Sequence, residues 1–156
     1  MKLVNKETGL RIFIEQSLID TLARYGLDQY PKEFGGVLVG YYSDDKRTAN
    51  IIDSILPIDF KSTETTFERG VAGLKEALED YYHQNPSLVY IGEWHTHPNV
   101  APVPSYTDYN AMRVIVTADS VSIDNPVMII IGLTEKSAEF AFFIYKENKL
   151  YKYEII

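Results

Sequence analysis

The stretch Gly92-Glu-Trp-His-Thr-His-Pro98 decides how this chain is interpreted, together with the segment Ser105-Tyr-Thr-Asp108 that follows it. An apolar run leads into the first stretch and predicts a β-strand with two histidines at its far end. Side chains two positions apart on a strand point to the same face, so His95 and His97 can approach one ion. Asp108 adds a carboxylate from the next segment. Two imidazoles and one carboxylate suit a catalytic zinc ion with one coordination position left open.

Each half of this pattern also has a simpler structural explanation. A His-x-His pair is common at strand ends, and Ser105 followed by Asp108 is what the first turn of a helix favours, a side-chain cap and a carboxylate. The chain has only 3 histidines, however, and two of them lie here. The combination therefore favours a metal site over two unrelated features. His83, the third histidine, is predicted to be solvated and without a role.

Composition excludes several other classes of protein. A length of 156 residues, 46% of them hydrophobic, predicts a single globular domain over residues 1–156. The net charge of -7 argues against a nucleic-acid partner, because phosphate binding needs clustered Lys and Arg. The absence of cysteine leaves metal binding to histidines and carboxylates. No apolar signal region opens the sequence, and no run approaches the ~18 residues that span a bilayer, so we expect a cytoplasmic protein without a membrane partner.

The spacing of apolar residues predicts an α/β fold with a mixed central β-sheet flanked by helices. A first helix is expected over residues 17–25, with Ser17 as its N-cap and Gly26 as its stop. A second, amphipathic helix is expected over residues 67–84, and a third begins at Ser105. The polar, aperiodic residues 59–68 predict a loop. The predicted strands cover residues 10–15, 36–42, 50–58, 88–94, 127–133, 138–145 and 150–155.

A hydrolytic zinc site also needs a general base, a group that accepts a proton from water and passes it to the leaving group. Two carboxylates qualify. Glu33 stands directly before Phe34-Gly-Gly-Val-Leu-Val-Gly40, at the mouth of a predicted buried strand, and Glu93 lies two residues before His95 on the same strand. The residues alone leave the choice between these two carboxylates open.

Together, these segments resemble the signature of the JAMM (JAB, MPN-plus) zinc metalloprotease family. The match comprises Glu33 with the glycine-containing strand, then His95-Thr-His-Pro98, six residues, Ser105, two residues and Asp108. The likeness covers roughly residues 8–150 and implies a cytidine-deaminase-like JAB/MPN architecture. It further implies that His95, His97 and Asp108 bind one catalytic Zn²⁺. Glu33 would then hold and deprotonate the catalytic water, and the Ser105 hydroxyl would stabilise the oxyanion.

The resemblance implies a zinc-dependent isopeptidase or peptidase that cleaves after the C-terminal residue of a ubiquitin-like or otherwise conjugated protein. The short chain is most similar to stand-alone bacterial members, several of which accompany E1- and E2-like enzymes in anti-phage systems such as CBASS. Two departures count against ubiquitin itself. Ala111 replaces a threonine common in eukaryotic deubiquitinases, and the 59–68 loop is shorter than the insertion with which they grip ubiquitin. The alternatives are a hydrolase of a sulfur-carrier protein or small peptide, and a non-catalytic MPN-type assembly module.

Overall fold

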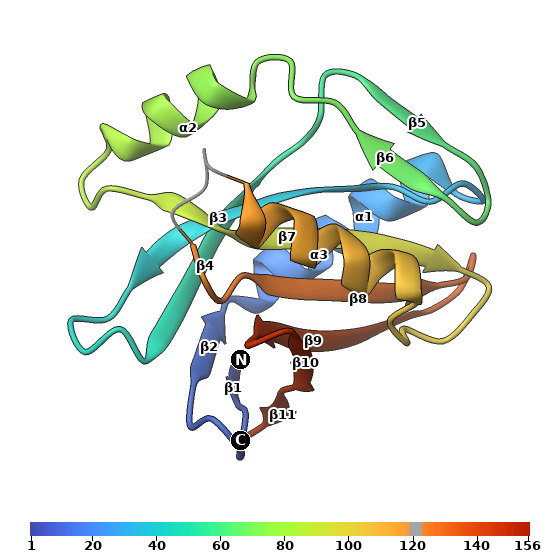
Figure 1. Ribbon diagram of the computed structural model, residues 1–156. Coiled ribbons are helices and arrows are strands. Elements are labelled where there is room, and N and C mark those ends of the chain that lie inside the picture. Colours follow the sequence, from blue (N-terminus) through green and yellow to red (C-terminus); the bar gives the residue numbers. More distant parts are fainter. Residues whose placement is uncertain (119–122) are drawn as a thin grey trace.

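The computed structural model describes residues 1–118 and 123–156 (Figure 1). The elements in chain order are β1 (Lys2–Val4), β2 (Arg11–Ile14), α1 (Gln16–Gln29), β3 (Gly35–Tyr42), β4 (Thr48–Ile55), β5 (Phe60–Ser62), β6 (Phe67–Arg69), α2 (Leu74–Tyr82), β7 (Val89–Pro98), α3 (Tyr106–Thr117), β8 (Val127–Leu133), β9 (Ala138–Lys146), β10 (Lys149–Lys152) and β11 (Glu154–Ile155). Nine strands form one sheet in the order β10-β9-β8-β7-β3-β4-β2-β1-β11. The β2–β4 and β7–β8 pairs are parallel and the others antiparallel, which confirms the predicted mixed sheet.

This sheet is strongly curled, because its two edge strands are consecutive in the chain. Only Tyr153 separates β10 from β11, so the strand predicted over residues 150–155 is divided there. In a flat nine-stranded sheet the two edges would lie roughly 38 Å apart, at ~4.8 Å per strand spacing. The Tyr153 backbone N–H donates to the carbonyl of Phe142 at 2.8 Å and holds the corner in place. Figure 1 shows β10, β11 and β1 together beside both chain termini.

Helices cover both faces of the sheet, and alternate residues of β8 show which helix lies where. Ile129 and Ile131 are fully buried in the core cluster that contains the inner face of α1. Met128 and Ile130 point the other way and pack with Met112 of α3. Figure 1 shows α3 crossing the sheet on the face opposite α1. None of the helices in the described ranges is long and apolar enough to cross a membrane.

The first helix is longer than predicted, because Gly26 serves packing and not helix termination. Helix α1 continues to Gln29, and its N-cap is Glu15, without a side-chain cap bond. A Cβ atom at Gly26 would lie 2.6 Å from the Cγ2 of Thr96 and 3.1 Å from a Leu133 methyl group. Because Gly26 has no side chain, the helix can lie directly against β7 and β8.

The predicted loop over residues 59–68 is wrong, because β5 and β6 form a two-stranded hairpin there. The sequence is polar overall, but each strand carries one phenylalanine. The ring centroids of Phe60 and Phe67 lie 5.1 and 5.8 Å from that of Phe34, in edge-on geometry. These contacts with a residue far away in the sequence stabilise strands that local periodicity does not reveal.

The second helix is shorter than the predicted span of residues 67–84. Helix α2 begins only at Leu74, and residues 67–69 belong to β6. Gly73 precedes the helix with a φ of 72°, in the left-handed region that disfavours side chains. The apolar residues with helical spacing lie within residues 74–82, and the helix begins only after Gly73. Leu74 and Leu78 pack against Val37 and Val39 of β3.

We predict that Gly26→Ala destabilises the protein, although alanine favours an exposed helix over glycine by about 1 kcal/mol. The added methyl group meets Thr96, which is fully buried and hydrogen-bonded to the backbone of Phe34 and so cannot move aside. Overpacking of this kind costs about 1–3 kcal/mol of unfolding free energy, measured by urea denaturation. Asp28→Ala, on the exposed side of the same helix, is the control and should change stability by less than about 0.5 kcal/mol.

Candidate metal centre

The two histidines lie on one strand, as predicted, but that strand is longer than expected. Strand β7 continues to Pro98, because its parallel pairing with β8 persists to the pair Pro98–Leu133. His95 and His97 therefore keep an extended backbone and project from the same face of the sheet. Their Nε2 atoms lie 3.1 Å apart, and the ring centroids are separated by 4.9 Å. The side chains are only 13% and 10% exposed, so the site is shielded from most of the solvent.

Gly35 lies beside this histidine pair because no side chain fits at its position. Gly35, at the start of β3, lies directly opposite His95 in the antiparallel register. A Cβ atom at Gly35 would lie 2.9 Å from the Cβ of His95 and 2.1 Å from the carbonyl oxygen of Trp94. No residue with a side chain fits between β3 and β7 at this level. The upstream glycine of the motif is thus a packing requirement of the histidine pair.

Asp108 reaches the histidines from the first turn of α3. Ser105 is the N-cap, and its hydroxyl oxygen accepts a hydrogen bond from the Asp108 backbone N–H at 3.1 Å. In return, Oδ2 of Asp108 accepts from the Ser105 N–H at 2.8 Å, which completes a capping box. The same carboxylate lies 3.1 Å from Nε2 of His95 and 3.2 Å from Nε2 of His97. The structural and the metal-binding interpretations of this segment are therefore compatible.

These three residues fit a single zinc ion. Their candidate ligand atoms all lie within 4.8 Å of one another. Ligands bound tetrahedrally at ~2.05 Å from zinc are separated by roughly 3.3 Å, and the distances here are 3.1 to 3.2 Å. Two neutral imidazoles and one carboxylate form the donor set of a zinc site that keeps a fourth position for water or substrate. The geometry brings the predicted ligands together; their role as ligands is a proposal.

Glu33 is brought to the same place by β-sheet register. Thr96 forms two hydrogen bonds with the backbone of Phe34. Its backbone N–H donates to the Phe34 carbonyl at 2.8 Å, and its hydroxyl oxygen accepts from the Phe34 N–H at 3.0 Å. Continuing the register by two residues from the Gly35–His95 pair places Glu33 opposite His97, on the face that carries the ligands. Its backbone N–H is held by the Thr63 carbonyl at 2.8 Å. Glu33 is one of the few buried charged residues, with 9% of its surface exposed.

The electrostatic environment of Glu33 suits a proton acceptor. Burial raises the pKa of its carboxyl above the usual value. The negative charge of Asp108 also raises this pKa, whereas the charges of His95 and His97 lower it. A carboxylate whose pKa is moved toward neutral pH accepts a proton more readily and holds it long enough to pass it on.

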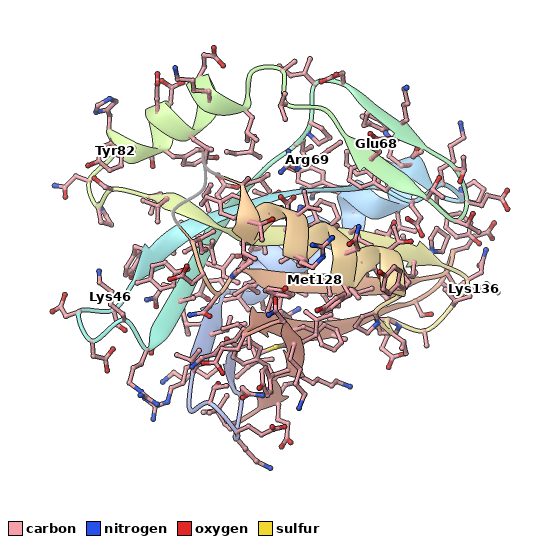
Figure 2. All side chains as sticks on the ribbon, in the orientation of Figure 1. Lys46, Glu68, Arg69, Tyr82, Met128 and Lys136 are labelled. Carbon is pink, nitrogen blue, oxygen red and sulfur yellow. The ribbon has the colours of Figure 1, made fainter. Side chains whose placement is uncertain are left out.

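Glu93, the second candidate base, is engaged elsewhere. Its Oε2 accepts from Nε of Arg69 at 2.9 Å, and its Oε1 accepts from the same guanidinium and from the Tyr90 hydroxyl at 3.0 Å. The hydrogen bond with Glu93 is the main reason why the pKa of Arg69 is raised. Arg69 is the last residue of β6, and Figure 2 labels it at the end of the β5–β6 hairpin that lies toward α2. Glu93 therefore joins the hairpin to β7, and Arg69 is a structural residue of this region that the sequence pattern did not single out.

The charges of the ligand residues support one another. Burial acts to raise the pKa of Asp108, but hydrogen bonds from His95 and His97 outweigh it and hold that pKa well below its usual range. Burial acts to lower the pKa of His97, but the hydrogen bond with Asp108 and the negative charges of Asp108 and Glu33 together outweigh it and raise that pKa. His83 is the C-cap of α2 and lies exposed, which agrees with its predicted solvated position.

The curled mixed sheet and the His-His-Asp cluster at the end of β7 define a JAB-type domain. Comparison with protein families matches residues 15–145 to the family described as prokaryotic homologues of the JAB domain, and the chain belongs to this family. The resemblance recognised in the sequence is thereby confirmed.

Two similar proteins and one solved structure extend this result. A CD-NTase/cGAS isopeptidase of Enterobacter hormaechei is 38% identical over 122 residues, 78% of this chain and 67% of that protein. A protein of Sinorhizobium fredii named "Probable metalloprotease y4qB" is 29% identical over 77% of this chain and 74% of its own length. The solution structure of a Desulfitobacterium hafniense protein, DSY2949, matches with a TM-score of 0.70 over 93% of this chain and 91% of that one. Its 18% identity makes this likeness one of fold alone.

We predict a pH dependence of stability for the metal-free protein that depends on Asp108. Because the folded-state pKa of His97 is raised above 6.5, its contribution to stability is complete below that pH and is lost as the pH rises through the folded pKa. Denaturation of chelator-treated protein should therefore show stability falling from pH 6 to pH 8. Asp108→Asn keeps a capping oxygen but removes the charge, so its curve should be flatter. Equal slopes for both proteins would contradict the pairing.

Proposed function

We propose that the protein is a zinc-dependent isopeptidase or peptidase that releases a ubiquitin-like or otherwise conjugated protein from its target. The observation that carries this proposal is the convergence of four side chains from three separate segments. The pair His95 and His97 comes from β7, Asp108 from α3 and Glu33 from the residue pair before β3. The pairing of β1 with β11 joins the two ends of the chain and supports one domain over residues 1–156.

His95, His97 and Asp108 would hold the zinc ion. When bound in such a site, zinc lowers the pKa of a coordinated water toward ~7 and polarises the substrate carbonyl. The capping box keeps the Asp108 carboxylate turned toward the histidines, because one of its oxygens is also bonded to the Ser105 N–H. The pairing of β7 with both β3 and β8 fixes the two imidazoles.

Glu33 would act as general base and then as general acid. It accepts a proton from the attacking water, whose oxygen adds to the carbonyl carbon of the scissile bond, and later donates that proton to the departing nitrogen. The carbon–nitrogen bond breaks, and the products are a C-terminal carboxylate and a free amine. The burial that raises the pKa of Glu33 favours this shuttle, and its register opposite His97 places it on the ligand face.

Ser105 would stabilise the oxyanion that forms on the carbonyl oxygen. Its hydroxyl oxygen accepts the capping bond from the Asp108 N–H, which leaves the hydroxyl hydrogen free to donate. A preorganised donor at the position of developing charge lowers the barrier, because its alignment does not have to be established during the reaction. The serine can therefore serve as helix cap and as catalytic donor at the same time.

The proposed substrate follows from the relatives. The Enterobacter hormaechei protein is named a CD-NTase/cGAS isopeptidase, and an isopeptidase requires a conjugated protein. We propose the same reaction class for this chain, in which deconjugation opposes E1- and E2-like enzymes in a bacterial anti-phage system. The β5–β6 hairpin replaces the loop expected from the sequence, so a short folded element is available beside the site.

We predict that Glu33→Gln lowers turnover by about 10² to 10⁴-fold while zinc stays bound, since the substitution removes the base and none of the ligands. His97→Ala should lose both activity and zinc. Zinc content is measured by atomic absorption on purified protein, and activity is measured with an isopeptide-linked conjugate of a ubiquitin-like protein.

Glu93→Gln is the matched control for Glu33→Gln, since it changes the second carboxylate considered for the base. Its turnover should stay within a few-fold of the wild type, although stability falls because the Arg69 ion pair is weakened. Equal losses in the two variants would disprove the assignment of the base. Unchanged turnover of Glu33→Gln would favour the assembly-module alternative. Faster cleavage of short peptides than of the folded conjugate would favour the carrier-protein or small-peptide alternative.

We predict that Ser105→Gly separates the two functions of this serine. Glycine is a tolerated N-cap, so the unfolding free energy should fall by only a few tenths of a kcal/mol. Loss of one oxyanion donor lowers turnover by about 10² to 10³-fold, with little change in KM. Steady-state kinetics and urea denaturation on the same preparation test both statements. A loss of stability that accounts for all of the lost activity would leave Ser105 with a structural role alone.

A further inference from the structure

The curled sheet leaves a pocket of about 300 Å³ at one of its ends. Four core residues form its buried wall, Ala49, Val127, Ile144 and Tyr153, and none is more than 6% exposed. They belong to β4, β8, β9 and the corner between β10 and β11, so the pocket is the mouth of the curled sheet. Mouths of β-barrels are frequent small-molecule sites, and ~300 Å³ is at the lower end of the usual range of volumes.

The pocket lies at the opposite end of the sheet from the metal centre. Val127 begins β8 and pairs with Gly92, whereas Gly132 near the end of β8 pairs with His97. Five residues of strand separate these levels, roughly 17 Å at ~3.3 Å per residue. The pocket is therefore not part of the proposed hydrolytic site, and an inference about it does not depend on the proposed reaction.

The rim of the pocket is positively charged. Arg11, Lys46 and Arg47 are the rim cations, and Asp124 is the one carboxylate among the described lining residues, so three positive charges face one negative charge. The chain as a whole has a net charge of -7. Asp45, an exposed neighbour outside the lining, interacts with Arg11 and Arg47 and offsets part of this charge. A local excess of positive charge in an acidic protein attracts anions to this position.

Two phenol groups complete the pocket. Tyr42 and Tyr153 both line it, and in the described part of the chain neither hydroxyl is hydrogen-bonded to another residue. Within the same residues, no side-chain nitrogen or oxygen that is shielded from solvent lacks a partner. Within these residues nothing competes for either hydroxyl, so both can donate to a ligand. Burial raises the pKa of Tyr42 to about 12 and raises that of Tyr153 as well, so both phenols stay protonated and can donate.

We propose that this pocket binds a small organic anion, with its apolar or aromatic body against the buried wall and its phosphate or carboxylate against the rim cations. The apolar wall favours an organic body over a bare inorganic ion, because covering it removes apolar surface from water. The phenol hydroxyls add hydrogen bonds that fix the orientation of the ligand. Charge at the rim, apolar surface at the wall and a few convergent donors together form the pattern of a small-molecule site.

Phenyl phosphate tests this proposal on the zinc-loaded full chain, with benzoate as the carboxylate probe and benzyl alcohol as the neutral control. Two-dimensional NMR should show saturable shifts of the amide signals of Ala49, Val127 and Ile144 with one or both anions. Benzyl alcohol should bind at least tenfold more weakly. The affinity should also fall as salt is raised, since charge at an exposed rim is screened. The anion that binds more tightly identifies the preferred group.

Two lysines provide a matched pair of variants. Figure 2 labels Lys46 and Lys136 at opposite ends of the molecule, and both are exposed. Lys46→Gln should weaken phenyl phosphate at least threefold, and Lys136→Gln should leave the affinity unchanged. Tyr153→Phe removes only a hydroxyl and should weaken binding to a similar degree; if it lowers the melting temperature, Lys46→Gln alone decides. Shifts confined to the signals of His95 and His97, equal effects of the two lysine variants, or equal binding of benzyl alcohol would each overturn the proposal.

Discussion

The candidate site depends on the pairing between the start of β3 and the end of β7. Thr96 supplies both bonds that hold Phe34, one from its backbone and one to its side-chain oxygen. These bonds align Glu33 with His97 across two segments separated by about sixty residues of sequence. The same threonine contacts α1, where Gly26 allows the helix to approach. The buried side chain of Thr96 thus contacts α1 through its methyl group and holds the backbone of Phe34, next to Glu33, through its hydroxyl.

The residues at the start of α3 have two roles. The groups that cap this helix are also the groups that complete the site, because the Asp108 carboxylate accepts from the Ser105 N–H while it faces both imidazoles. The helix therefore cannot begin elsewhere without losing the position of the third candidate ligand. The capping box stabilises the first helical turn and also orients the Asp108 carboxylate toward the two imidazoles, which explains why neither interpretation of the sequence excludes the other.

The hairpin formed by β5 and β6 shows how structure away from the ligands supports them. Arg69 at its end forms an ion pair with Glu93, and Phe60 and Phe67 pack on Phe34. Glu33 lies immediately before Phe34, and its N–H is held by Thr63 in the hairpin turn. The hairpin thus fixes the backbone on both sides of the proposed base. The ion pair with Arg69 also engages both oxygens of Glu93, the second carboxylate considered for the base.

The sequence by itself determined the candidate ligand types, the strand that carries the histidines and the helix start that carries Asp108. These features are local, since strand alternation and helix capping act over four residues or fewer. It also determined the mixed α/β class, through the order of apolar segments. The residues alone left Glu33 and Glu93 open as the base, and the family resemblance implied Glu33. Only the tertiary structure shows that register between distant strands places Glu33 opposite His97 and that the guanidinium of Arg69 engages Glu93.

Tertiary contacts likewise overrode the local pattern in three places. The phenylalanines of residues 59–68 find their partner in Phe34, so a polar segment becomes a hairpin. Gly26 resembles a helix stop but lies under Thr96 inside α1, because close packing requires the absence of a side chain. The division of the last strand at Tyr153 exists only because the sheet curls and its edges meet. Each of these features depends on contacts between residues far apart in the sequence, so the local pattern of neighbouring residues cannot predict it.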